Sequence, residues 1–255
     1  MDLISPYVRR AGTALKRALL TPSKVQRRAY LIIASPRSAS NFTLRVLTQG
    51  SGLPGVLLKT ENGFGHFSVD LGKVPFHQDF VWYQHLFPTE RNKLIVTNIS
   101  KAAPVLVWRD AFDWTVSMAE WFVQNGRCPW GVGTDRAMIV AKETPVPFAA
   151  AAQYVIDFEL PLYLRFLAGW QDFSLRTSEI LFVDFTKITQ QTESVMEELK
   201  QLGWPLTCQK KPMRGRNVNY SVGQIGRGRS MLEESQIEQI ARLVERTGMS
   251  WVIEH

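Results

Sequence analysis

Residues 35–42 form a run rich in hydroxyl side chains, and they separate an apolar segment from a helical pattern. The run reads Ser-Pro-Arg-Ser-Ala-Ser-Asn-Phe and directly follows the β-forming segment Ala29–Ala34. The first backbone N–H groups of a helix are unpaired, and the helix dipole attracts negative charge to them. Ser38 and Ser40 add hydroxyl donors, and Arg37 adds a cation with a fixed fork of donors. The pattern therefore predicts a phosphate or sulfate site; the alternative is a serine-rich helix cap with a surface arginine.

This run differs from the phosphate-binding loop of the common ATPases. The pattern GxxxxGK(S/T) is absent, and no lysine follows a glycine in the run. ATP hydrolysis by that route is therefore disfavoured. A small-molecule kinase with a degenerate loop is one alternative function, and a non-catalytic protein that binds nucleotides or other anions is another.

A second basic group stands at the end of another apolar segment. Arg109 follows residues 103–108, and Ser117 lies eight positions later in a helical pattern. Two helical turns bring Ser117 back toward the strand end, so the pair predicts a second phosphate site.

Apolar segments alternate with helical patterns along the chain, and the segments lack the period-2 alternation of a half-exposed strand. We predict strands at residues 29–34, 103–108 and 179–184, and helices at residues 43–47, 111–122, 148–170, 194–202 and 235–244. This order indicates a parallel sheet covered by helices on both faces. Ligands bind such sheets at the carboxyl ends of the strands, where residues 35–41, Arg109 and Asp184 fall. Residues 54–101 are predicted to be irregular α/β, and residues 125–147 a loop or lid.

Four segments, in this order, resemble motifs of the PAPS-dependent sulfotransferases. Pro36–Phe42 resembles their 5′-phosphosulfate loop, usually written P-(K/R)-S-G-(S/T)-(S/T)-(W/F/L). Val105–Ser117 resembles their 3′-phosphate motif, a hydrophobic strand followed by R-(D/N)-x-x-(D/E)-x-x-x-S. Ile180–Phe185 is similar to the strand that ends in Y-E-D-L, and Val222–Gly226 stands where the family has K-G-x-x-G.

The resemblance implies a single α/β domain over residues 29–255, with a central parallel sheet flanked by helices in a P-loop-like sulfotransferase fold. It also implies the cofactor 3′-phosphoadenosine 5′-phosphosulfate (PAPS) and 3′,5′-ADP as product. The sulfuryl group would pass to a hydroxyl or amine of a small molecule or saccharide. No metal is expected, because Arg37 and backbone donors can neutralise the leaving phosphate.

The same resemblance assigns roles to individual residues. Arg37 takes the position near the bridging oxygen. The other implied contacts are Ser38, Ala39, Ser40 and Asn41 to the 5′-phosphate, Phe42 and Phe182 to adenine, Arg109 and Ser117 to the 3′-phosphate, and Gly223 and Gly226 in the late glycine motif.

The chain departs from the family pattern at several of these positions. Ala39 replaces a glycine, so we expect a negative φ or mild strain there. Asn41 replaces a hydroxyl residue. Residues 221–222 are Ser-Val where the family has Arg-Lys, and we hypothesise that Arg227 or Arg229 meets the 3′-phosphate instead.

His85 is the predicted general base. It lies in Tyr83–Pro88, which resembles the family's K-T-H-L-P segment, 24 residues before Arg109. An imidazole titrates near neutrality and can accept the proton of an acceptor hydroxyl. The alternative bases are Glu61 and His66, and the alternative role for His85 is a packed histidine bound to a carbonyl.

The amino-acid composition indicates a globular protein and a reducing cellular compartment. Among 255 residues, 45% are hydrophobic and 21% charged, as in a globular protein. No apolar run approaches the roughly 20 residues that span a bilayer. Cys128 and Cys208 form no CxxC pair, which excludes a disulfide scaffold and fits the cytoplasm.

The positive charge gathers at the N-terminus. Residues 1–28 hold seven basic side chains and one acid, so they carry six of the seven net positive charges. A uniformly basic nucleic-acid-binding domain would look different, and no nucleic-acid partner is expected. Apolar residues recur there at helical spacing. The segment is therefore either a basic amphipathic helix on an anionic membrane surface or a helix docked on the domain.

Overall fold

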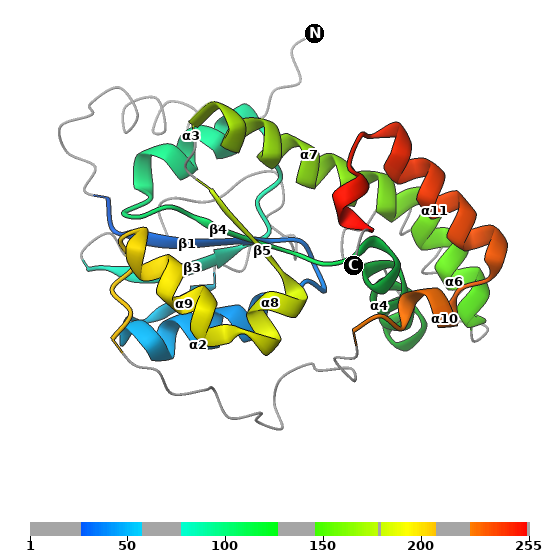
Figure 1. The fold of residues 1–255 in the computed structure, drawn as a ribbon, viewed down its shortest axis with the longest axis horizontal. Coiled ribbons are helices and arrows are strands. Elements are labelled where there is room, and N and C mark those ends of the chain that lie inside the picture. The colour runs from blue at the N-terminus through cyan, green and yellow to red at the C-terminus, as the bar shows by residue number, and fades with distance from the viewer. Residues whose placement is uncertain (1–26, 58–77, 127–145, 178–179, 208–224, 254–255) are drawn as a thin grey trace, which may run out of the picture.

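The central sheet has five parallel strands in the spatial order β2-β3-β1-β4-β5 (Figure 1). This computed structural model describes residues 27–57, 78–126, 146–177, 180–207 and 225–253. The strands are β1 (Ala29–Ala34), β2 (Gly55–Leu57), β3 (Phe80–Gln84), β4 (Val105–Trp108) and β5 (Leu181–Asp184). The predicted single α/β domain with a parallel sheet is therefore confirmed.

Strand β1 lies in the middle of the sheet, and both of its faces are buried. Tyr30 and Ile32 pack into one apolar cluster, and Leu31 and Ile33 pack into the other. Successive side chains of a strand point to opposite faces, so a strand between two helical layers reads as an unbroken apolar run. This is why residues 29–34 are predicted correctly, whereas β4 and β5 each begin two residues later than predicted.

Helices cover both faces of the sheet (Figure 1). One face carries α2 (Ser40–Ser51), α8 (Phe185–Gln190) and α9 (Thr192–Gln201). The other carries α3 (Glu90–Ile99) and α7 (Leu160–Thr177).

A second group of helices packs beyond the carboxyl ends of the strands (Figure 1). Its members are α4 (Ala111–Asn125), α6 (Phe148–Tyr154), α10 (Gly228–Met231), α11 (Glu234–Arg246) and a final 3₁₀ turn (Ser250–Val252). A π-helical turn (Val155–Glu159) joins α6 to α7. The predicted helix at 148–170 is thus part of one longer helical run that ends at Thr177.

Two segments were predicted to lack regular structure, residues 54–101 and residues 125–147. The stretch predicted as irregular, residues 54–101, contains β2, β3 and α3, so it is more regular than expected. Most of the predicted loop or lid, residues 127–145, lies outside the described residues, and so does the basic segment 1–26. Within the described part, no helix is both long and apolar enough to cross a membrane.

Candidate active site

Four chain segments leave the sheet side by side at its carboxyl edge. The aligned pairs there are Ile33 with Gln84, Ala34 with Val107, and Trp108 with Asp184. The residues that follow the strands, namely Ser35, His85, Arg109 and Phe185, therefore emerge at one edge. The sheet brings together the turn, the histidine and the second arginine that the sequence predicts as site residues.

The turn between β1 and α2 is strained. Arg37 and Ala39 have φ values of 66° and 58°, in the left-handed region that favours glycine. This conformation costs an L-residue roughly 1–2 kcal/mol. Of the two outcomes expected for Ala39, the structure therefore has the strained one.

Ala39 also leaves the start of α2 without a side-chain cap. It occupies the N-cap position, and no side chain accepts a hydrogen bond from the first turn there. Asn41 is exposed at this helix start, and Phe42 is half-buried against the apolar cluster beneath α2. Uncapped N–H groups at the positive end of a helix can bind an anion.

Buried side chains hold this turn in place. The hydroxyls of Ser35 and Ser38 lie 2.5 Å apart, and the indole of Trp114 donates to the carbonyl of Pro36 at 2.9 Å. Trp114 in turn stacks on Tyr163, with ring centroids 4.3 Å apart. Because the partners come from α4 and α7, the turn is fixed against the body of the fold.

The side chain of Arg37 reaches across to helix α4. Its Nε donates to the Ser117 hydroxyl at 3.1 Å, and its guanidinium lies 5.1 Å from the ring centroid of Trp121. Ser117 is almost fully buried. The serine predicted to hold the 3′-phosphate therefore lies against the arginine of the turn.

Arg109 is buried and tightly positioned. The Tyr163 hydroxyl donates to its carbonyl oxygen at 2.5 Å and accepts from its N–H at 2.9 Å. Its guanidinium lies 4.4 Å from the ring centroid of Phe185 and 3.7 Å from Asp113 Oδ2. Only 5% of the residue is exposed, so little water would compete with a ligand that contacts it.

The arginines repel one another electrostatically. Burial lowers the pKa of Arg37, and the charges of Arg109 and Arg227 lower it further. Burial also lowers the pKa of Arg109, with the Asp113 carboxylate opposing and Arg227 reinforcing that change. An anion between such groups would relieve their repulsion, so their placement favours a negatively charged ligand.

Asp113 ties the late glycine motif to helix α4. Its carboxylate accepts from Gly226 N–H at 2.8 Å and from Gly228 N–H at 2.7 Å. Gly228 has no room for a side chain, because a Cβ would lie 2.4 Å from the Phe112 carbonyl carbon. This docking brings Gly226 to Arg109, whereas Gly223 lies outside the described residues.

A cavity of about 140 Å³ opens beside Arg109. Its lining residues are Arg109, Asp110, Phe112, Asp113, Asp184, Phe185, Thr186, Ile225, Gly226, Gly228 and Arg229. Asp110 and Asp184 are occupied there as N-caps of α4 and α8. Arg109 and Arg229 supply its positive charge.

The two arginines hypothesised to replace the family's basic pair differ in their partners. Arg227 forms a bidentate pair with Glu120, at 2.7 and 2.5 Å. Arg229 lines the cavity and lies 4.1 Å from the Phe112 ring centroid. The geometry therefore favours Arg229 over Arg227 for an incoming phosphate.

Phe182 is not brought to this site. Its ring lies 6.1 Å from the Trp251 ring and lines a different cavity. Phe185, three residues later, lines the cavity of Arg109 instead. Phe185, rather than Phe182, is therefore the aromatic residue of this strand end that lies beside Arg109.

His85 has both ring nitrogens engaged. Nδ1 lies 2.7 Å from the carbonyl oxygen of Ala34, and Nε2 lies 2.6 Å from the Tyr83 hydroxyl. A carbonyl only accepts, so Nδ1 carries a proton, and in the neutral ring Nε2 accepts from Tyr83. Burial raises the pKa of Tyr83, and a hydrogen bond to Ser40 opposes the change. The alternative bases Glu61 and His66 lie outside the described residues.

The described residues contain no cluster of three or more histidine, cysteine, aspartate or glutamate side chains that could hold a metal ion. Positive charge at the site comes from arginines and helix starts. The site can bind an anion and position an imidazole beside it.

Comparison with solved structures supports the fold. No family model matches the chain, and no curated protein matches it. Its structure is similar to the crystal structure of mouse sulfotransferase SULT7A1 complexed with PAP. The TM-score is 0.61 at 12% sequence identity, over 90% of this chain and 88% of that one. This chain has the sulfotransferase fold. The predicted fold is thereby confirmed, and the resemblance seen in the sequence has a structural counterpart.

Sequence reasoning missed several residues that build the site within the sulfotransferase fold. Tyr163 positions Arg109, and Trp114 holds the turn. In the sequence, both residues look like ordinary aromatic residues of the core. Phe185 and Tyr83 lie within the quoted motifs, but the motifs do not indicate their contacts with Arg109 and His85. Glu120 gave no signal, because its partner Arg227 is 107 residues away.

Proposed function

We propose that this chain is a sulfotransferase that moves the sulfuryl group of PAPS to a hydroxyl or amine of a small molecule or saccharide. One observation carries the proposal above all. The half-buried Arg37 and the buried Arg109 stand at the carboxyl edge of a sulfotransferase fold, and the charge of Arg109 lowers the pKa of Arg37. Like charges held close together repel, and a cofactor with phosphates at both ends would add negative charge between them.

The residues present fit such a cofactor. The uncapped first turn of α2 and Arg37 would hold the 5′-phosphate end. Arg109, with Arg229 beside it, would hold the 3′-phosphate in the cavity that Gly226 and Gly228 border. Phe185 forms an aromatic wall there. When bound, PAPS supplies an activated sulfuryl group and leaves as 3′,5′-ADP.

The chain's own residues would lower the barrier by charge and by proton transfer. Arg37 and the N–H groups of α2 face the negative charge that grows on a leaving phosphate. Ser117 fixes Arg37 through its hydrogen bond at 3.1 Å. His85 would take the acceptor's proton at Nε2, and for this Nε2 must exchange the Tyr83 hydroxyl for the acceptor. Ala34 holds the opposite nitrogen and so keeps the correct tautomer.

A second candidate function is non-catalytic binding of a nucleotide or another anion. The engagement of both His85 nitrogens favours it, because a fully bonded imidazole has no lone pair ready for an acceptor. The anion site would be the same in both cases. Turnover distinguishes the two functions.

Ligand preference and transfer test the proposal in order. The melting temperature of the full chain should rise with 3′,5′-ADP and much less with ATP and Mg²⁺, because binding to the folded state stabilises it. Transfer of ³⁵S from labelled PAPS to an acceptor library should then give labelled product. Stabilisation by 3′,5′-ADP without transfer selects the non-catalytic function. A preference for ATP and Mg²⁺ contradicts the proposal and supports a kinase.

Location and acceptor complete the proposal. We propose a cytoplasmic protein whose residues 1–28 make peripheral contact with an anionic membrane, on the charge pattern of that segment alone. Co-sedimentation with phosphatidylserine vesicles should be lost when residues 1–24 are deleted. Equal sedimentation of both forms would contradict the membrane contact.

A further inference from the structure

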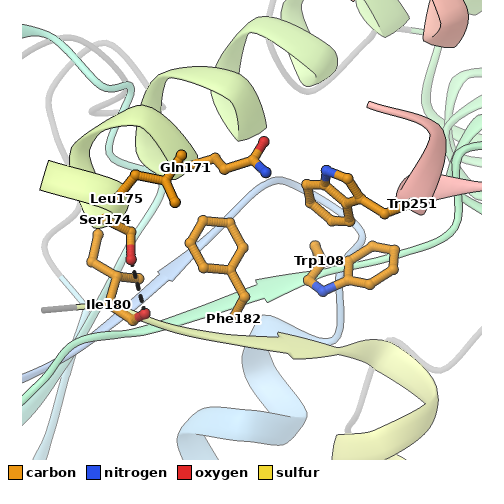
Figure 2. A pocket seen from close by; sticks show the side chains of 7 residues that line it. All are labelled: Trp108, Gln171, Ser174, Leu175, Ile180, Phe182 and Trp251. Atoms are coloured by element: carbon orange, nitrogen blue, oxygen red, sulfur yellow. Dashed lines mark hydrogen bonds between the residues drawn. The ribbon is translucent and has the colours of Figure 1, made fainter. Parts of the chain in front are cut away.

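A second cavity lies along the edge strand β5, away from the arginines. It encloses about 580 Å³ between β5, helix α7 and the final 3₁₀ turn (Figure 2). Its lining residues are Trp108, Gln171, Ser174, Leu175, Ile180, Phe182 and Trp251. This volume falls within the roughly 300–1,000 Å³ typical of small-molecule sites.

Three aromatic rings form the wall of this cavity. Trp108 packs edge-to-face on Trp251, with ring centroids 4.8 Å apart, and Phe182 packs edge-to-face on Trp251 at 6.1 Å. Edge-to-face packing fixes the rings while leaving faces for a further ring to contact. Figure 2 shows Phe182 between the α7 residues and the two tryptophans.

The polar groups at the cavity are few and neutral. None of the lining residues is charged. The hydroxyl of Ser174 donates to the Ile180 carbonyl at 3.2 Å and is thus occupied. Trp251 Nε1 is buried, and within the described part of the chain it has no hydrogen-bond partner. A buried donor without an acceptor is costly, so a ligand acceptor that reached this N–H would remove that cost.

This cavity is separate from the proposed active site. Trp108 and Phe182 belong to the apolar layer that α7 covers, whereas the Phe185 ring faces Arg109. In the sheet, β1 and β4 lie between β3, which leads to His85, and β5. Three strand spacings of about 4.8 Å separate the two regions by roughly 14 Å. A ring held beside Ile180 therefore cannot reach His85.

We propose that this cavity is a binding site for a small neutral ring compound with one hydrogen-bond acceptor. The ring contacts Trp108, Phe182 and Trp251, and the acceptor receives the Trp251 Nε1–H. The Gln171 amide lies on the same side of the cavity as this nitrogen (Figure 2) and adds a second polar contact for a larger ligand. The site is independent of the proposed transferase function.

Coumarin and indene form a matched pair of probes. Both are flat bicyclic molecules, but only coumarin has a carbonyl acceptor. Neither has a hydroxyl or an amine, so neither can accept a sulfuryl group, and the result does not depend on catalysis. The full chain labelled with ¹⁵N gives indole N–H signals from its eight tryptophans. The Trp251 signal is the one that the variant Trp251→Phe lacks.

Coumarin should bind saturably, with a Kd of about 0.1–1 mM, and shift the Trp251 N–H signal downfield. Trp251→Phe keeps the aromatic wall but loses the donor, so it should weaken coumarin about tenfold and leave indene unchanged. Leu175 is 78% exposed at the cavity, so Leu175→Trp should narrow the entrance and weaken both probes. Leu202→Trp, at another exposed leucine, is the control and should change neither.

Two results would overturn the proposal. One is the absence of saturable coumarin binding to the unmodified chain. The other is binding that neither Trp251→Phe nor Leu175→Trp weakens, which would put the probe elsewhere on the protein. Melting curves of each variant, taken beforehand, identify any variant that is unfolded at the titration temperature, and the other variant then decides.

Discussion

The replacement Arg109→Ala tests whether this arginine recognises a 3′-phosphate. Arg109 is 5% exposed and lies in the cavity that Gly226 and Arg229 border, so a phosphate there would meet it with little competing water. A charge-assisted hydrogen bond contributes about 1.5–3 kcal/mol. Loss of Arg109 should therefore raise the Kd of 3′,5′-ADP by about 10- to 150-fold.

Calorimetric titration with 3′,5′-ADP and with 5′-AMP measures this effect. The two ligands share every group except the 3′-phosphate, so the ratio of their affinities reports on that group alone. The unmodified chain should prefer 3′,5′-ADP, and Arg109→Ala should lose most of the preference. Arg176→Ala, at an exposed arginine of α7, is the control and should keep it.

The ratio also guards against a purely structural effect. Removal of Arg109 leaves the buried Asp113 carboxylate without its cationic neighbour at 3.7 Å, although Gly226 and Gly228 still donate to it. Some loss of stability is therefore expected, and it would weaken both nucleotides alike. If both affinities fall by the same factor and the preference is unchanged, Arg109 does not read the 3′-phosphate and the reasoning is wrong.

Four further predictions concern the turn after β1, the general base, the glycine at the start of α10, and metal dependence. Ala39→Gly should relieve the left-handed strain and stabilise the fold by about 0.5–1 kcal/mol in urea denaturation. His85→Ala should lower turnover by about 10²–10⁴-fold without changing the Kd of 3′,5′-ADP, whereas Tyr83→Phe should keep turnover because it frees Nε2. Gly228→Ala should destabilise the fold by about 1–3 kcal/mol, since its Cβ would clash with Phe112. Turnover should survive EDTA.

Each of these predictions has a distinct contrary result. A less stable Ala39→Gly would mean that the methyl group packs usefully in the turn. Full activity in His85→Ala would return the role of base to Glu61 or His66. An unchanged denaturation midpoint in Gly228→Ala would show that α10 can move away from α4. Activity lost in EDTA and restored by Mg²⁺ would support the kinase alternative.

The parts of the fold that sequence reasoning recovered are those with a local signal. Residues 29–34 are apolar on both strand faces, and residues 234–246 repeat apolar positions at helical spacing. Strand β3 was not predicted, although all five of its residues are buried. Its position depends on pairing with β1, which joins Ala29 to Phe80 across 51 positions. No local pattern encodes such a pairing.

The same limit applied to the site. The spacing of Arg37, Arg109 and Ser117 was visible in the sequence, because each follows a recognisable strand or lies on the helix after it. The clamp from Asp113 to Gly226 joins residues 113 positions apart and depends on how α10 docks. The motif resemblance assigns Phe182, which lies within β5, whereas Phe185 lies past the strand end, in the first turn of α8, and contacts Arg109.

His85 shows why a motif alone does not define a catalytic base. The motif gives the residue type and its place after β3, but the fold sets its protonation. The Ala34 carbonyl accepts only, so Nδ1 must carry a proton, and in the neutral ring Nε2 keeps its lone pair. Burial raises the pKa of Tyr83 and keeps its hydroxyl protonated, so this hydroxyl donates to that lone pair. This tautomer has its lone pair at Nε2, as a general base needs, but the hydrogen bond from Tyr83 occupies that lone pair. His85 can take a proton at Nε2 only when an acceptor displaces the Tyr83 hydroxyl.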